Sequence, residues 1–135
     1  MGSQAKIVGA ISLTGVVASM WCECTFGEDS FKAFLENFLF PELQPGNIVV
    51  MDNVSFHKTE SIINIIESVG ARVVFLPPYH PELNPIEHMW SKFKMKLKKL
   101  IGKGEEYATA VKKGLMSVTP SNCEGWFENC DYFLS

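Results

Sequence analysis

The sequence predicts a mixed α/β fold in which short strands are flanked by helices. Two β-rich runs near the start, 5–13 and 16–22, are separated by a short polar break. A strand, a helix and a second strand are expected over 47–76. A long amphipathic helix then begins near residue 85. Together these patterns favour one α/β domain that spans residues 1–135.

The first third predicts a hairpin followed by a short helix. Thr14-Gly15 suits a tight turn because glycine accepts positive φ angles, so the two β-rich runs should pair as an antiparallel hairpin. Asp29 or Ser30 can cap a helix over 31–39, whose phenylalanines and leucine recur at helical spacing. Pro41 and Gly46 then break the helical pattern.

The order strand, helix, strand predicts a parallel β-α-β crossover in the middle of the chain. Residues 47–52 are a short, almost continuous apolar run, which is typical of a central strand buried on both faces. A helix over 60–69 carries isoleucines on one side and ends at Gly70. The next strand is expected at 72–76.

A long helix should begin at Asn84-Pro85, because asparagine is a good N-cap and proline suits the first helical position. Its apolar stripe is Ile86, Trp90, Phe93, Leu97 and Ile101. An adjacent row at helical spacing holds Glu87, Ser91, Lys94 and Lys98. Two further helices are expected at 105–118 and 121–129, separated by Pro120.

Charge is distributed unevenly along the chain. The net charge is −3, which gives no overall attraction to nucleic acid. Half of the twelve basic residues nevertheless fall within 92–103, where there is no acid: Lys92, Lys94, Lys96, Lys98, Lys99 and Lys103. Such a run is either a solvated helix face or a phosphate-binding stripe.

Composition fits a globular protein without a membrane span. No apolar run reaches the ~18 residues that a membrane span requires, and the start lacks a signal-peptide pattern. We therefore expect a cytoplasmic protein whose four cysteines are free thiols.

Two carboxylates, Asp52 and Glu87, are placed at the ends of predicted elements. Asp52 ends a parallel strand, where open α/β sheets bind ligands, and Glu87 opens the long helix. Carboxylate oxygens suit Mg²⁺ or Mn²⁺, and two such ions can support displacement at phosphorus. Taken singly, Asp52-Asn53 could instead form a turn, and Glu87 could complete a capping box with Asn84.

The surrounding motifs favour the catalytic interpretation. The segments IVVMDNVSFH and LPPYHPELNPIEHMWSKFK resemble the catalytic core of DDE transposases, specifically bacterial insertion-sequence enzymes related to the mariner group. The resemblance implies a ribonuclease H-like fold, a mixed sheet flanked by helices, and a triad of acids that binds two Mg²⁺ or Mn²⁺ ions. Asp52 matches the second acid and Glu87 the third, with thirty-four residues between them.

The resemblance also implies supporting residues and partners. Asn53 could orient the Asp52 carboxylate or position DNA, or serve only in a turn. His57 could contact phosphate or a metal-bound water, or only lead into the following helix. Asn84 should help to set the position of Glu87, and Lys94 and Lys98 could contact DNA phosphates. The expected partners are the DNA of the transposon ends and of the target.

The first acid of the triad has no match in this chain. Residues 1–22 contain no aspartate or glutamate, and Glu23 is the earliest acid. We therefore expect a truncated catalytic domain that lacks its first central strand and is inactive in DNA strand cleavage and strand transfer by itself. The alternative is a non-catalytic transposase remnant that binds DNA or oligomerises. The exposed sheet gap should be filled by a displaced strand or by a second copy in a homo-oligomer.

Overall fold

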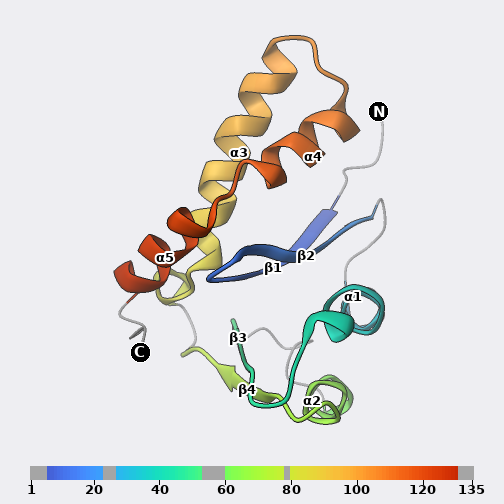
Figure 1. The fold of residues 1–135 in the computed structure, drawn as a ribbon. Coiled ribbons are helices and arrows are strands. Elements are labelled where there is room, and N and C mark those ends of the chain that lie inside the picture. The colour runs from blue at the N-terminus through green and yellow to red at the C-terminus, as the bar shows by residue number, and fades with distance from the viewer. Residues whose placement is uncertain (1–5, 23–26, 53–59, 78–79, 131–135) are drawn as a thin grey trace. The chain divides into compact units, whose positions relative to one another are not determined.

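The computed structural model describes residues 6–22, 27–52, 60–77 and 80–130. Helices accompany two two-stranded sheets, one formed by β1 and β2 and the other by β3 and β4 (Figure 1). The chain divides into two compact units, the first made of Met1–Ala10 with Val17–Pro81 and the second of Ile11–Val16 with Glu82–Ser135. The predicted mixed α/β fold, with small sheets flanked by helices, is confirmed.

The N-terminal hairpin is present, with its turn one residue earlier than predicted. Strand β1 (Lys6–Ser12) and strand β2 (Gly15–Cys22) are joined by Leu13 and Thr14. The Ser12 hydroxyl oxygen accepts the Thr14 backbone N–H at 3.1 Å, which closes the turn. Gly15 has φ +126° and opens the second strand, so the glycine serves the strand entry rather than the turn itself.

In the first unit, the predicted helix over 31–39 begins earlier and changes its winding. Helix α1 (Glu28–Phe34) starts after Gly27, whose carbonyl accepts the Phe31 N–H at 3.0 Å. Neither Asp29 nor Ser30 is the cap, since both lie inside the first turn of α1. Asp29 suits that position too, because the helix dipole favours an acidic residue there. A π-helical segment (η1, Leu35–Leu39) and a 3-10 turn (η2, Phe40–Glu42) continue the helix beyond α1, so helical winding ends at Glu42, one residue after Pro41.

The β-α-β crossover is confirmed as parallel. Strand β3 (Ile48–Met51) pairs in register with strand β4 (Arg72–Phe75), and helix α2 (Glu60–Glu67) lies between them in sequence. Helix α2 ends at Glu67, and the turn after it reaches Gly70, which has φ +84° and whose carbonyl accepts the Gly46 N–H at 2.9 Å.

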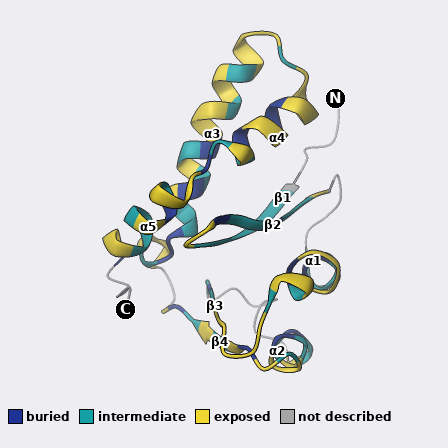
Figure 2. Ribbon diagram, viewed as in Figure 1, coloured by how far each residue is buried: buried dark blue, intermediate teal, exposed yellow. Residues whose placement is uncertain are grey.

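One face of the β3–β4 pair packs on the core of the first unit. Figure 2 shows buried residues in this unit on α1, α2 and β3, and they form a single cluster: Ala18, Phe31, Phe34, Leu35, Leu39, Met51, Ile62, Ile66 and Ala71. The opposite face is open, because Ile48 is 59% exposed and Val74 is 45% exposed. The prediction of a strand buried on both faces is therefore wrong: the alternation of side chains places Ile48 away from the cluster.

The second unit consists of three helices and the hairpin tip. They are helix α3 (Ile86–Gly102), helix α4 (Tyr107–Met116) and helix α5 (Pro120–Asn129). The most deeply buried residues of α3 are Met89 and Phe93, and the Trp90 ring meets the Phe93 ring edge-on at 5.7 Å. Ile101 is 43% exposed, so the predicted apolar stripe does not stay buried to its end.

Two other expectations can be compared with the described residues. Cys123 and Cys130 are thiols outside any disulfide, as predicted for these two, and both are buried. The helices in the described ranges all lack the length and apolar character that crossing a membrane requires.

Candidate active site

Asp52 directly follows the buried end of β3. The last residue of the strand, Met51, is 7% exposed, and its carbonyl accepts the Leu76 N–H at 2.9 Å. Met51 is already paired with Phe75, and this bond extends the pairing by one residue on the β4 side, to Leu76. The strand end is thus fixed by its neighbour, and the Asp52 side chain is half-exposed. The carboxylate therefore has solvent access at the carboxyl end of a parallel strand, where α/β folds bind ligands.

Glu87 lies in the first turn of α3 and is half-exposed. Its backbone N–H donates to the Asn84 carbonyl at 3.1 Å. The carboxylate stands at the positive end of the helix dipole, which favours a negative charge there. Two residues further on, Met89 is fully buried and anchors this turn to the unit.

Asn84 fixes the start of that helix. It is 8% exposed, and its side-chain oxygen accepts the Ile86 N–H at 3.2 Å. Pro85 already has helical dihedral angles of φ −55° and ψ −28°, although the regular helix begins at Ile86. The predicted asparagine cap is therefore one residue too early: Pro85 is the N-cap and makes no side-chain capping bond, and Asn84 holds the Ile86 N–H from the position before it.

Ser91, Lys94 and Lys98 follow Glu87 at about one, two and three helical turns along α3. All three are exposed, and the spacing places them on the side of the helix that carries Glu87. A carboxylate and two ammonium groups thus share one helix face.

Asn53 and His57 lie outside the described residues, so the supporting roles expected for them stay predictions. Asp52 belongs to the first unit, whereas Asn84 and Glu87 belong to the second. The structure therefore defines the local setting of each carboxylate within its own unit.

The donor set fits a hard divalent cation. Asp52 and Glu87 both offer carboxylate oxygens, which Mg²⁺ and Mn²⁺ prefer, and both have solvent access. Within the ranges that the structure describes, no three His, Cys, Asp or Glu side chains gather into a metal cluster.

A contact that sequence reasoning missed joins α3 to α5. The Lys92 Nζ donates to the Asn122 side-chain oxygen at 2.5 Å. Asn122 also completes a capping box with Thr119, and Pro120 occupies the first turn of α5. A sequence pattern could have predicted this capping box: Thr119 and Asn122 are three residues apart, with Pro120 directly after Thr119. That pattern places the start of the helix at Pro120, one residue earlier than predicted.

Comparison with known proteins decides the family. A family model described as DDE superfamily endonuclease matches residues 1–106. This chain belongs to the DDE endonuclease superfamily. The matched part of this DDE endonuclease contains both Asp52 and Glu87, and members of the superfamily generally use divalent metal ions on DNA. A comparison with curated proteins gave no match.

Proposed function

We propose that this DDE endonuclease chain is the catalytic domain of a transposase from the bacterial insertion-sequence group related to mariner. Asp52 and Glu87 would hold Mg²⁺ or Mn²⁺ at the point where a DNA phosphodiester is attacked. The observation that carries the proposal is the placement of the two acids: one ends a parallel strand and the other opens a helix, both within the part that the family model matches.

The residues of this chain would divide the work as follows. Asp52 and Glu87 bind the cations, and Asn84 keeps the first turn of α3 in place beneath Glu87. Lys94 and Lys98 would contact backbone phosphates near Glu87. Asn53 would orient the Asp52 carboxylate or position the DNA, and His57 would contact phosphate or a metal-bound water. When bound, the metal ions supply activation of the attacking oxygen and stabilisation of the leaving oxygen.

The third carboxylate of such a site has no counterpart among residues 1–22, which contain no aspartate or glutamate. We therefore expect that this chain by itself cleaves DNA and transfers strands very poorly. The same observation supports a second candidate function, in which the chain is a non-catalytic transposase remnant that binds DNA or oligomerises.

Oligomerisation through the sheets is part of this proposal. In the described residues, β1–β2 and β3–β4 form separate sheets, and Ile48 and Val74 leave an apolar face of β3–β4 open. A strand added to β3 would complete a parallel sheet that otherwise has only two short strands. Light scattering coupled to gel filtration tests this: a strict monomer at high micromolar concentration would argue against it.

The metal site is tested by titrating Mn²⁺ into the full chain by calorimetry. Asp52→Asn and Glu87→Gln should each weaken binding at least about 10-fold, because each removes one charged ligand. Glu124→Gln, an exposed residue on α5, is the matched control and should leave binding unchanged. Unchanged Mn²⁺ affinity in both the Asp52→Asn and the Glu87→Gln variants would overturn the proposed site.

Activity is tested separately with supercoiled plasmid in Mg²⁺ or Mn²⁺. We expect little or no nicking by this chain. Strong nicking that Asp52→Asn abolishes would show that no third carboxylate is needed, and it would exclude the non-catalytic alternative.

A further inference from the structure

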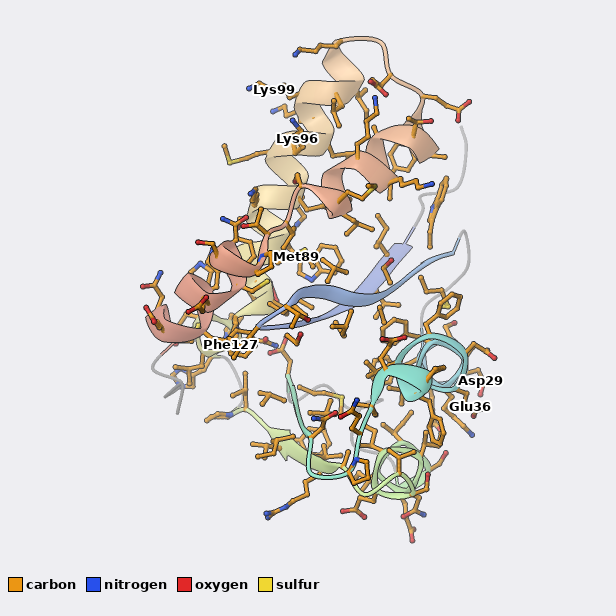
Figure 3. The ribbon with its side chains drawn as sticks, viewed as in Figure 1. Asp29, Glu36, Met89, Lys96, Lys99 and Phe127 are labelled. Atoms are coloured by element: carbon orange, nitrogen blue, oxygen red, sulfur yellow. The ribbon has the colours of Figure 1, made fainter. Side chains whose placement is uncertain are left out.

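Helix α3 carries a second row of lysines that the proposed site does not use. It consists of Lys92, Lys96 and Lys99 on the helix and of Lys103, its C-cap, spaced four, three and four residues apart. At 100° per residue, this row lies about 150° around the helix from Lys94 and Lys98. Lys96, Lys99 and Lys103 are exposed, and Figure 3 labels Lys96 and Lys99 on this stretch of α3.

The row is not neutralised within the described residues. The only acid on α3 is Glu87 in its first turn. The lysine ion pair described in this unit involves a residue outside the row: Lys113 of α4 lies 2.6 Å from Glu105, which precedes that helix. Like charges one turn apart repel by a few tenths of a kcal/mol per pair. The helix dipole compensates Lys99 and Lys103 near the C-terminus, but it does not compensate Lys96.

The base of the row is fixed in place. Lys92 is half-buried and donates to the Asn122 oxygen, which also accepts the Thr119 N–H at 3.1 Å. Its charge therefore stands beside the N-terminus of α5, where the helix dipole adds further positive potential. The four lysines thus form a positive ridge that is held at one end and projects into solvent at the other.

We propose that this second lysine row binds the phosphate backbone of duplex DNA, as a contact separate from the one beside Glu87. The inference rests on the proposed function, because it takes DNA as the polyanion that the protein meets. From Lys96 to Lys103 the helix rises about 10 Å, which is about the axial distance of three phosphates on one strand. Since the two rows face different directions, one strand cannot follow both. The second row therefore contacts a different segment of DNA and gives affinity without sequence readout.

Salt dependence tests the inference. The full chain, in EDTA, is titrated into a fluorescent duplex of about 30 base pairs at several NaCl concentrations, and anisotropy gives the Kd. The double variant Lys96→Gln/Lys99→Gln should make the negative slope of the log association constant against log salt less steep by about 1.8, because each lost phosphate contact removes about 0.9. Lys32→Gln/Lys112→Gln makes the same charge change on α1 and α4 and should leave the slope nearly unchanged.

Equal slopes for the two double variants would overturn the proposal, as would a chain that does not bind the duplex. Displacement of the labelled duplex by polyglutamate as well as by unlabelled DNA, at equal charge concentration, would also overturn the proposal. It would show that the lysine row binds acidic protein segments equally well. Acetylation of the wild-type chain gives an independent readout: DNA should protect Lys96, Lys99 and Lys103 but not Lys112. Since these measurements need no metal, their failure is distinct from a failure of Mn²⁺ binding at Asp52 and Glu87.

Discussion

Gly114 offers a direct test of how α4 packs on the helix that carries Glu87. A methyl group at this position would lie 2.9 Å from Phe93 Cδ1 and 3.0 Å from its Cε1. Phe93 is 3% exposed and its ring is flanked by Trp90, so it cannot easily move away. Overpacking of this kind costs about 1–3 kcal/mol, and we expect the upper half of that range. Alanine regains about 1 kcal/mol of helix propensity, so Gly114→Ala should destabilise the protein by about 1–2 kcal/mol.

Gly125 on α5 is the matched control. It also lies inside a helix, but a methyl group there would meet nothing within 4 Å. Gly125→Ala should therefore stabilise the protein by up to about 1 kcal/mol, the opposite sign. Urea unfolding followed by tryptophan fluorescence measures both changes.

A double-mutant cycle separates the clash from other effects. In a Phe93→Leu background, Gly114→Ala should cost at least about 1 kcal/mol less than in the wild type, because the ring atoms that it meets are gone. If Gly114→Ala stabilises the wild-type protein as much as Gly125→Ala does, the packing described between α3 and α4 is wrong.

The remaining predictions concern Asn84 and Cys123. Asn84→Ala should destabilise the protein by about 1 kcal/mol, because the Ile86 N–H loses its acceptor. Asn84→Ser should recover much of the loss by supplying a hydroxyl oxygen. Urea unfolding measures both, and an equal loss for the two variants would argue against a stabilising role of this hydrogen bond. Burial raises the pKa of the Cys123 thiol above its ordinary 9.0, against smaller opposing effects of the Gly15 backbone and the Lys92 charge. The unfolded chain therefore loses this proton at lower pH than the folded protein. The contribution of the Cys123 thiol to the free energy of unfolding is thus present below pH 9 and is lost as pH rises further. Thermal unfolding between pH 7 and 10 should show that fall, and Cys123→Ala should reduce it; an identical pH dependence in the variant would refute the assignment to this thiol.

The sequence predicted the order and type of the elements because local patterns determine them. The parallel crossover was correct because an apolar strand, an amphipathic helix and a second strand of these lengths allow few other connections. The start of α3 was predicted to within one residue because Asn84 and Pro85 act through local backbone chemistry. Asp52 and Glu87 were placed at element ends for the same reason.

Burial of individual side chains and contacts between distant residues could not be predicted, because both depend on how the elements pack against one another. Periodicity identified an apolar stripe on α3, but the deepest residue is Met89, outside that stripe, because the packing partners select the buried side. Similarly, the apolar run of β3 gave no indication that Ile48 would be exposed. The bond from Lys92 to Asn122 joins residues thirty positions apart, which no local pattern contains.

The N-terminal hairpin is shared between the two units. Its tip, Ile11–Val16, belongs to the second unit, whereas the rest of both strands belongs to the first. The chain therefore passes from one unit to the other and back before it reaches Pro81, where it leaves the first unit finally. No single cut can release either unit whole. A gene fragment that starts at Glu82 would lack the segment that contains Gly15, a residue that lies close to the Val118 carbonyl in the intact unit. Each unit of this DDE endonuclease is thus discontinuous in sequence, so a truncation at Pro81 would remove Ile11–Val16 from the second unit.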